Sequence, residues 1–488
     1  MDQHSAKMPS PLLSIVPILA LVALLFVTIR IFGSDALNGA SQVVLLTTTA
    51  ITSLLAMVFC KVSWKAIEAA ICDNILGVAT ALLILLLIGA LSGSWMISGV
   101  VPTLIYYGMQ IIHPQFFLAS CCLICAIVSV MTGSSWTTIA TIGIALMGIG
   151  EAQGFETGWV AGAIISGAYF GDKISPLSDT TVLASSVTGT PLFTHIRYML
   201  ITTTPTMLIT LAIFTVAGFM HSTEASSQIA EFAASLKGTF HISLWLLAVP
   251  VVTGVLIARK VPPLITLFVS AILAALFAVL FQPHLLHEIA GDSSAGGSSL
   301  FKGTLMTLYG STGIDTGNAA LNDLVSTRGM GGMMNTIWLI LCAMCFGGAM
   351  TASRMLESLT STLFRFMRKR VGLVSSTVCS GLFFNIVTAD QYISIILTGN
   401  MFKGIYKEKG YESRLLSRTT EDAVTVTSVL VPWNTCGMTQ ATILGVSTMA
   451  YLPYCFFNLI SPLMSILVAA TGYKIKQHHE ENKDFPVS

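Results

Sequence analysis

Apolar segments of the kind that cross a lipid bilayer recur along almost the whole chain. A membrane-spanning helix needs about 20 mostly apolar residues. Only 10% of the 488 residues are charged, whereas soluble domains carry about a quarter, so a water-soluble protein is excluded. Continuous apolar runs also differ from the alternating strands of a membrane barrel. We therefore predict an all-α polytopic membrane protein whose apolar runs cover residues 12–31, 43–60, 76–91, 198–219, 244–257, 264–280, 337–350 and 452–470.

Several other classes of protein are excluded by the motifs that the chain lacks. The first apolar run, residues 12–31, is longer than the roughly 7–15-residue core of a signal peptide, so we interpret it as a membrane helix. The pairs Cys122/Cys125 and Cys342/Cys345 have no nearby histidine or second pair to complete a metal site. We interpret these cysteines as helix-packing residues. With no basic face, nucleotide-binding motif or nucleophile–base spacing, we expect no nucleic-acid partner and no enzymatic activity.

The distribution of lysine and arginine predicts which loops face the cytoplasm, where these residues accumulate. We place Lys7 inside and count one crossing for each apolar run. Residues 113–115 and 151–158 then fall outside, and both chain ends are cytoplasmic. The basic residues that this topology places inside are Lys61, Lys65, Arg197, Arg259, Lys260, Lys474 and Lys476.

A re-entrant hairpin is predicted in the second half of the chain. Residues 373–401 are mostly apolar, yet basic residues lie on both sides of them. A segment whose two ends lie on one side must enter the membrane and return, and we place its turn near Thr388, Ala389 and Asp390. The matching stretch, residues 116–149, has no basic flanks, so we predict a hairpin that enters from outside. The basic flanks of residues 373–401 are Arg365, Arg368, Lys369 and Arg370 before them and Lys403, Lys407, Lys409, Arg414 and Arg418 after them.

Each predicted hairpin tip is followed by a proline-containing break in another apolar segment. Thr132 at the first tip is 47 positions before Asp179, and Thr388 at the second is 46 positions before Asn434. Unwound backbone at membrane depth is tolerated only around protein or a water-filled cavity, and opposed repeats with broken helices are typical of secondary transporters. The two breaks read Gly171-Asp172-Lys173-Ile174-Ser175-Pro176-Leu177-Ser178-Asp179-Thr180-Thr181 and Leu430-Val431-Pro432-Trp433-Asn434-Thr435-Cys436-Gly437.

These features predict two inverted-topology repeats with re-entrant hairpins and discontinuous helices. Cytoplasmic tails are expected at residues 1–10 and 473–488, and connecting helices and loops at residues 221–330. The first repeat covers residues 11–220, with its hairpin at 116–149 and its broken helix at 159–187. The second covers residues 331–472, with its hairpin at 373–401 and its broken helix at 419–449.

At these motifs the chain resembles the NhaC family of Na⁺/H⁺ antiporters. The resemblance extends over about residues 43–470 and implies ion sites built from hairpin tips and broken helices, with elevator-like transport. One departure is Ala389, where the family has a glycine before the acid. Exchangers of organic acids and some amino-acid carriers are also similar to this family, so the resemblance leaves the substrate open. It is carried by residues 171–180, by Thr132-Gly133-Ser134-Ser135-Trp136, by Asp390-Gln391-Tyr392 and by Pro432-Trp433-Asn434-Thr435-Cys436-Gly437.

Ionisable side chains inside a membrane are costly and mark functional sites. Asp179 is the leading candidate for a site that binds Na⁺ or a proton, and capping of a half-helix is its alternative role. Asp390 is the second candidate, with a water-exposed hairpin tip as the alternative. The hydroxyls of the first tip are either cation ligands or helix-packing groups. The polar residues expected around these sites are Ser178, Thr180 and Thr181, then Thr388, Asn385, Asn434 and Thr435, then Thr132, Ser134 and Ser135.

The remaining polar and aromatic residues have alternative interpretations. Asp172 and Lys173 either couple protons to transport or form ion pairs, with each other or with a partner elsewhere. Glu421 and Asp422 are interpreted as interfacial ion-pairing residues, because Arg414 and Arg418 precede them. The residues expected at helix ends near the interface are His113 and His195, and the bulky residues expected to close the cavity, rather than stack on an organic ligand, are Trp136, Tyr392 and Trp433.

Together these residues predict a secondary transporter that exchanges Na⁺ for H⁺ across the bacterial inner membrane by alternating access. A single carboxylate can bind either ion, because burial favours its protonated form and a nearby cation favours its ionised form. The alternative is Na⁺- or H⁺-coupled transport of an amino acid or a small organic acid of the malate or lactate type, with Lys173 holding the substrate carboxylate. The expected partners are sodium ions, protons and the lipid bilayer, with a homodimer left open, and no cofactor is expected.

Overall fold

The computed structural model of the chain describes residues 9–32, 39–111, 113–176, 178–220, 226–259, 261–291, 296–316, 322, 325–361 and 369–477. Every named element in these ranges is helical. Within them, eight helices are long and apolar enough to cross a membrane, or up to ten if each of two bent helix pairs is one span. The predicted all-α polytopic fold is confirmed. The residues of the predictions that lie outside the described ranges are Lys7, Leu177, Lys260, Arg365, Arg368 and parts of both tails.

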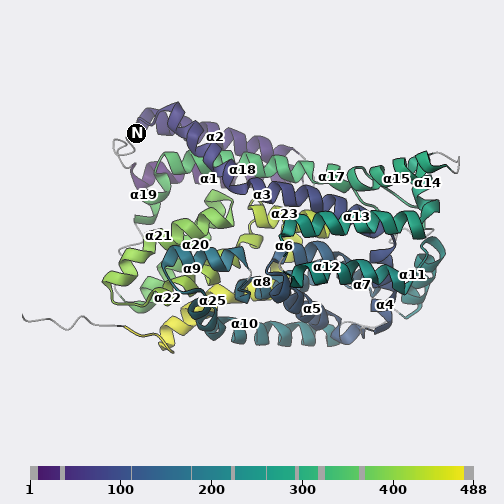
Figure 1. Cartoon of the computed structure of the whole chain (residues 1–488). Helices are drawn as coiled ribbons and strands as arrows, with labels where there is room; N and C mark the ends of the chain where they lie inside the picture. The colour runs from purple at the N-terminus through teal and green to yellow at the C-terminus, as the bar shows by residue number, and fades with distance from the viewer. Residues whose placement is uncertain are drawn as a thin grey trace, which may run out of the picture.

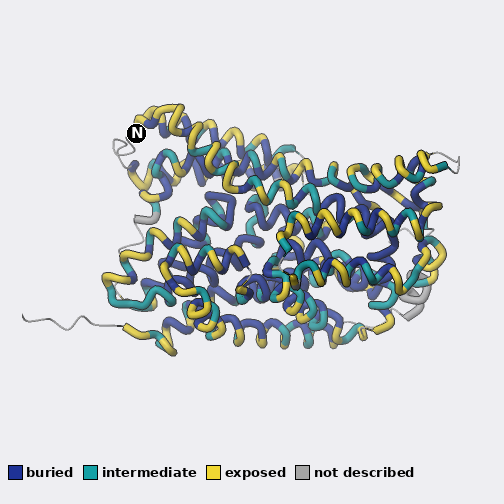
Figure 2. Tube along the Cα trace, in the orientation of Figure 1, coloured by how far each residue is buried: buried dark blue, intermediate teal, exposed yellow. Residues whose placement is uncertain are grey.

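The long helices form a bundle in which most axes follow one direction (Figure 1). Figure 2 shows exposed residues along the outer helices and buried residues through the interior. Outside the segments of the two breaks, the helices of this bundle are α1 (Pro11–Phe32), α2 (Ala40–Phe59), α3 (Trp64–Ile97), α4 (Val100–Ile111), α10 (Leu192–Met220), α11 (Ser226–Thr239), α12 (Ala248–Ala258), α13 (Pro263–Phe281), α14 (Pro283–Ala290), α15 (Gly297–Tyr309), α17 (Gly329–Gly332), α18 (Met334–Ala352), α19 (Met355–Ser361), α24 (Thr448–Tyr451) and α25 (Phe456–Thr471).

The first predicted tip and break coincide with helix ends. Helix α5 (Phe117–Thr132) stops at the tip, and α6 (Ser135–Thr138), the π-helix η3 (Ile139–Gly143) and α7 (Ile144–Ala152) follow it. The break separates α8 (Thr157–Ile174) from α9 (Asp179–Thr188), and Pro176 lies in the gap. A proline there cannot supply the backbone N–H that a continuous helix would need.

The second half of the chain has a comparable series of helices. Helix α20 (Arg370–Thr388) stops at the tip and α21 (Gln391–Glu408) leaves it. Helix α22 (Ser413–Thr420) continues into the π-helix η6 (Glu421–Thr425) and the 3₁₀ helix η7 (Ser428–Leu430), and α23 (Thr435–Leu444) begins after the break. Helices α9 and α23 each have 10 residues and end at a left-handed glycine. Re-entry of the hairpins into the membrane and the inverted orientation of the repeats stay predictions.

The two tips are built on the same turn. Gly133 and Ala389 both adopt left-handed backbone, with φ of 68° and 56°. Left-handed backbone is uncommon for residues other than glycine, so Ala389 adopts at the second tip the turn that Gly133 forms at the first. The residue that follows, Ser134 or Asp390, accepts a hydrogen bond from the amide three positions on. The preceding threonine bonds to the hydroxyl six positions on, at 3.1 Å from Thr132 to Thr138 and 2.8 Å from Thr388 to Ser394.

Close packing of α5 against α8 places the first tip beside the first break. A Cβ atom at Gly167 would lie 2.0 Å from the carbonyl oxygen of Cys122, and one at Gly171 would lie 2.4 Å from the Cβ of Ser129. Small residues four positions apart allow membrane helices to approach this closely. Helix α8 lies in the middle of the molecule (Figure 1), and most of its residues are buried.

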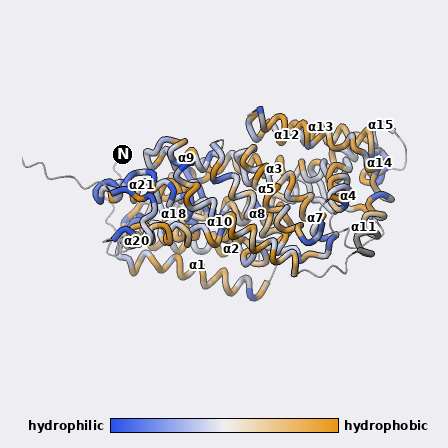
Figure 3. The backbone as a smooth tube through the Cα atoms, turned by 90° about the horizontal axis from the view of Figure 1, so that it is seen from below, coloured by the Kyte–Doolittle hydropathy of each residue, from blue (hydrophilic) through white to orange (hydrophobic). Residues whose placement is uncertain are grey.

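Several segments with basic residues lie at one end of the molecule. Arg370, at the start of α20, donates to the carbonyl of Ala469 at 2.6 Å, and Thr190, before α10, donates to Ser413 at 3.0 Å. Figure 3 shows hydrophilic residues around α21 and hydrophobic residues along α1, α12 and α13. The turns that the sequence places in the cytoplasm after α9, before α20 and after α21 therefore share one end, whose orientation in the membrane stays a prediction.

Candidate functional site

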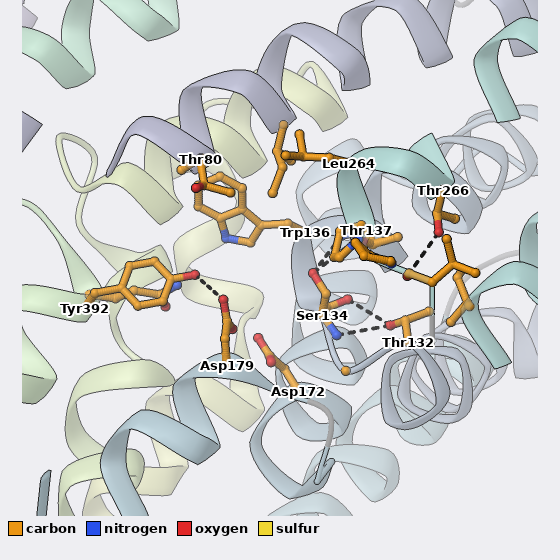
Figure 4. A pocket seen from close by; sticks show the side chains of 18 of the residues that line it. Thr80, Thr132, Ser134, Trp136, Thr137, Asp172, Asp179, Leu264, Thr266 and Tyr392 are labelled. Atoms are coloured by element: carbon orange, nitrogen blue, oxygen red, sulfur yellow. Dashed lines mark hydrogen bonds between the residues drawn. The ribbon is translucent and has the colours of Figure 1, made fainter. Parts of the chain in front are cut away.

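A cavity of about 600 Å³ lies between the first tip, the first break and the start of α21 (Figure 4). It therefore joins residues from both halves of the chain. The rest of its wall is mostly apolar and comes from α3 and from the turn between α12 and α13. The polar and aromatic residues that line it are Thr132, Ser134, Trp136 and Thr137 from the first tip, Asp172 and Asp179 from the first break, Gln391 and Tyr392 from α21, and Thr80 and Thr266 from the wall.

Asp172 is the buried carboxylate of this cavity. Its Oδ2 accepts a 2.7 Å hydrogen bond from Ser135 and its Oδ1 a 2.6 Å bond from Ser178. Ser178 also lies 2.9 Å from the hydroxyl of Thr180. Hydroxyl donors suit an ionised carboxylate, and each hydroxyl oxygen retains lone pairs for a further ligand. The tip and the break thus provide an oxygen-rich cluster around Asp172, which the sequence had ranked below Asp179.

Asp179 faces the same cavity from the first turn of α9. Its Oδ1 accepts from the amide of Thr180 at 2.9 Å, and its Oδ2 accepts from the phenol of Tyr392 at 2.7 Å (Figure 4). The helix cap is Ser178, which accepts from the amide of Thr181. The N-cap of α9 is therefore Ser178, but Asp179 also accepts from a free amide of the first helical turn, so a capping contact coexists with its place at the cavity. The N-terminal end of the helix dipole favours a negative charge at this position.

The hydroxyls of the first tip lie where the sequence predicted them, but they serve the turn as well as the cavity. Thr132 bonds to both the amide and the carbonyl of Ser134 at 3.1 Å. Ser134 caps α6 by accepting from Thr137 at 3.2 Å. Ser135 alone among these three hydroxyls binds Asp172 directly.

The charge of the cavity favours cations. Among the described residues that line it there are two carboxylates and no lysine, arginine or histidine. Carboxylate and hydroxyl oxygens suit hard cations, and a proton competes for the same carboxylates. Trp136 and Tyr392 line this space, whereas Trp433 lies elsewhere and donates to the carbonyl of Ile386 at 2.7 Å. The arrangement can therefore hold a cation and exchange it for a proton.

The second predicted cluster is separate from the cavity. Thr435 donates to Oδ2 of Asp390 at 3.1 Å, and its amide donates to the carbonyl of Ala389 at 2.8 Å. Asp390 is 1% exposed, so a water-exposed tip is wrong. Thr388 and Asn434 are also buried, and Asn434 caps α23. These contacts join the second tip to the second break, as Ser135 and Asp172 do in the first half, and cation binding here stays a prediction.

Lys173 does not line the cavity. Its fully buried Nζ forms an ion pair with Asp422 and donates to Ser461 at 3.0 Å. Lys173 lies in the last turn of α8 and Asp422 lies in η6, so the pair links the two halves of the chain. Of the alternatives weighed from the sequence, Lys173 therefore pairs with a partner elsewhere, and Asp172 is left free for the cavity.

Sequence reasoning missed a fully buried polar helix. Residues 415–429 are all buried, including Arg418, Glu421 and Asp422, so the interfacial interpretation of Glu421 and Asp422 is wrong. His195 is also buried and bonds to Ser417, whereas His113 is exposed. The sequence of residues 417–422 contains no apolar residue. A segment this polar between apolar helices is stable inside a membrane only when other helices surround it, and that feature could have identified it.

The cysteine pairs pack against neighbouring helices. Cys122, Cys125 and Cys342 are buried and Cys345 is half-buried, all as free thiols. In the part of the chain that the structure describes, no group of three His, Cys, Asp or Glu residues could hold a metal ion. A sodium ion in the cavity would therefore depend on hydroxyl and carbonyl oxygens in addition to the two carboxylates.

Comparison with known proteins agrees with this arrangement. The model of a family described as the Na⁺/H⁺ antiporter family matches residues 7–186 and 167–473. The chain belongs to this family. Its resemblance to the NhaC antiporters is confirmed by the Na⁺/H⁺ antiporter NhaC of Alkalihalophilus pseudofirmus, which is 36% identical over 87% of this chain and 89% of that protein.

Other relatives are named for different exchanges. The malate-2H⁺/Na⁺-lactate antiporter of Bacillus subtilis (strain 168) is 38% identical over 84% of this chain and 85% of that protein. The arginine/ornithine antiporter ArcD of Halobacterium salinarum is 33% identical over 97% of this chain and 94% of that protein. Family membership therefore makes the protein an antiporter relative with a multi-helix membrane fold, and the substrate must be argued from the cavity.

Proposed function

We propose that this protein is a secondary active transporter that exchanges Na⁺ for H⁺ across the bacterial inner membrane by alternating access. The observation that carries the proposal is the cavity in which Asp172 and Asp179 converge with hydroxyl oxygens, with no lysine or arginine among the described residues that line it. A hard cation is bound by such oxygens. A proton on the same carboxylates removes the charge that holds the cation, so the two ions exclude each other.

The position of Lys173 counts against the organic acid as main substrate. A substrate carboxylate would need a cation in the cavity, but Lys173 is buried in its pair with Asp422. The negative cavity would instead repel an anion. The two NhaC relatives named as Na⁺/H⁺ antiporters, at 36% and 35% identity, support the same function.

A second candidate function is the coupled transport of a small organic solute. Its support is the volume of the cavity, about 600 Å³, because pockets of roughly 300–1,000 Å³ bind small molecules. The lining suits an organic cation or an amino acid better than a dicarboxylate, since the two lining carboxylates attract an ammonium group. A tightly fitted sodium site would need this space to be smaller in another conformation of the cycle.

The deciding experiment uses the purified protein in liposomes that contain a pH-sensitive dye. A sodium gradient alone should move protons in the opposite direction, whereas an equal choline gradient should not. Sodium without effect at any pH, combined with proton movement when malate, lactate, arginine or ornithine is present, would replace antiport of the two ions with the second candidate function. Protein-free liposomes correct for passive leak.

A further inference from the structure

Glu421 is a buried acid that the cavity does not use. It lies in the π-helix η6, its side chain is fully buried, and it is not among the residues that line the cavity. Neither of its carboxyl oxygens has a hydrogen-bond partner of normal geometry within the described ranges, although the Thr425 hydroxyl in the same π-helix lies near enough to favour the charged form. An ionised carboxylate in the protein interior costs several kcal/mol unless it is paired, so the stable form of Glu421 in this conformation is the neutral, protonated acid.

The charged groups on the surrounding helices are directed elsewhere. The charged side chains that act most strongly on Glu421 are Asp172, Lys173 and Asp422, and the last two are paired with each other. Helix α25 has no charged residue. Three titratable residues of α20 and α21 point to the outside of the molecule and so away from the buried Glu421: Cys379, Lys407 and Glu408. The groups that bind elsewhere are Arg370 on α20, Asp179 on α9, Tyr392, Lys403 and Tyr406 on α21, and Arg414 on α22.

Arg418 is the cation that an ionised Glu421 would be expected to bind. It lies three residues earlier, a spacing at which Arg and Glu on a helix can pair. Its three guanidinium nitrogens are buried and lack hydrogen-bond partners in the described part of the chain. The guanidinium instead covers the ring of Tyr198 at 4.7 Å, and its Nε lies 3.9 Å from Asp422. A buried acid and a buried cation that stay apart at this spacing agree with a neutral Glu421.

We propose that Glu421 is a second proton-carrying residue, separate from the cation cavity, which holds a proton in this conformation and releases it when sodium binds beside Asp172. This inference rests on the proposed function. The ion pair between Lys173 and Asp422 connects the cavity to the buried acid. Lys173 directly follows the cavity residue Asp172 in the chain, and Asp422 directly follows Glu421. The charge of Asp172 favours a proton on Glu421. A bound Na⁺ offsets that charge. In the conformation of the transport cycle that admits water to η6, the O–H bond of Glu421 breaks, a water molecule accepts the proton, and Arg418 pairs with the carboxylate that remains.

The protonation of Glu421 can be measured without transport. Infrared spectra of the purified protein in lipid at neutral pH should contain a carboxylic-acid C=O band that Glu421→Gln removes and that an exposed control, Glu156→Gln, keeps. Sodium should reduce the same band in the wild-type protein. A wild-type spectrum that Glu421→Gln leaves unchanged would overturn the proposal. If the Gln variant does not fold, Glu421→Asp serves instead, because the band must then shift, and an unshifted band would be equally damaging.

Transport separates the role of Glu421 from that of the cavity. Glutamine is close in shape to the protonated acid but cannot release a proton, so Glu421→Gln should move about one proton fewer per sodium ion, because only the cavity carboxylates still exchange protons. Exchange of labelled for unlabelled Na⁺ should stay within about twofold of the wild type. Equal losses of both exchanges would make Glu421 a structural residue only. If the wild-type protein moves no protons with sodium, the proposed function fails, and the sodium-sensitive infrared band still decides whether Glu421 holds a proton that cavity occupancy releases.

Discussion

The phenol of Tyr392 donates a 2.7 Å hydrogen bond to Oδ2 of Asp179 across the cavity (Figure 4). Tyr392 follows the second hairpin tip and Asp179 follows the first helix break, so this bond closes the carboxylate site of one half of the chain with a side chain from the other. If the two halves moved relative to each other, Tyr392 would separate from Asp179, and the oxygen atoms available to bind a cation would change. This is the kind of dependence that alternating access requires.

Replacing Tyr392 by Phe should weaken sodium binding. The phenol orients the Asp179 carboxylate, and a buried hydrogen bond to a charged group contributes about 1.5–3 kcal/mol. Asp179 is exposed to the cavity, so solvent screens this interaction. We therefore expect a loss of roughly threefold to tenfold in apparent sodium affinity. The measurement is sodium-driven proton flux at graded sodium concentrations. Tyr309→Phe, at an exposed tyrosine outside the cavity, is the matched control, and equal affinities in both variants would contradict the role of this bond.

Asp172→Asn and Asp179→Asn should each abolish sodium-dependent proton flux in a folded, membrane-inserted protein. The amide keeps the size of the acid but carries neither the exchanged proton nor the charge that holds the cation. Ser135 and Ser178 can turn their hydroxyls to accept from an amide at position 172, so the fold should persist. The control is Asp73→Asn, at an exposed acid of α3 outside the cavity. Normal flux in either cavity variant would remove that aspartate from the site.

Breaking the buried pair between the halves should cost stability rather than specificity. Lys173→Met leaves Asp422 buried without its main partner, and removal of one member of such a pair costs about 3–5 kcal/mol. Thermal unfolding of the purified variant should occur at a clearly lower temperature. The double variant Lys173→Met with Asp422→Asn should recover much of the loss, because no uncompensated carboxylate remains. A single variant as stable as the wild type would show that the pair is dispensable.

The positions of tips and breaks could be predicted from the sequence, because proline, polar clusters and basic flanks mark them directly. Both tips end a helix at the predicted threonine, and both breaks begin a new helix at or next to the predicted Asp179 and Asn434. The sequence does not show which residues on different helices are in contact, because the number of positions between two residues does not determine the distance between their helices. The partner of Lys173 lies 249 positions away, and no local pattern indicates such a contact.

Side-chain burial was the other feature that the sequence could not supply. Glu421 and Asp422 follow two arginines, a pattern typical of an exposed helix end, but η6 is enclosed by α20, α21, α22 and α25. Asp172 and Asp179 illustrate the same difficulty in the site, since the two carboxylates have similar surroundings in sequence. Only the packing of α5 against α8 brings Ser135 to Asp172 and makes it the buried member of the pair.

The topology can be tested with introduced cysteines in a background in which the exposed Cys72 and Cys379 are serine. Glu408 is exposed at the end of α21, among basic residues that predict a cytoplasmic location, and Glu156 is exposed in a loop predicted to lie outside. A membrane-impermeant thiol reagent should label Glu156→Cys in intact cells and Glu408→Cys only in inverted membranes. Labelling of both from one face would contradict the predicted inverted repeats.

The pH dependence of sodium affinity distinguishes one proton site from two. If a single carboxylate in the cavity binds either ion, the apparent sodium dissociation constant should increase about tenfold for each unit by which the pH is lowered in the acid range. The reason is that one proton displaces one sodium ion. A second proton on Glu421 that sodium must also displace makes the rise steeper than tenfold per unit. Glu421→Gln should return the steeper dependence to tenfold, since its amide does not titrate, while Glu156→Gln should leave it unchanged. Sodium affinity that does not vary with pH in the wild-type protein would exclude competition between the two ions.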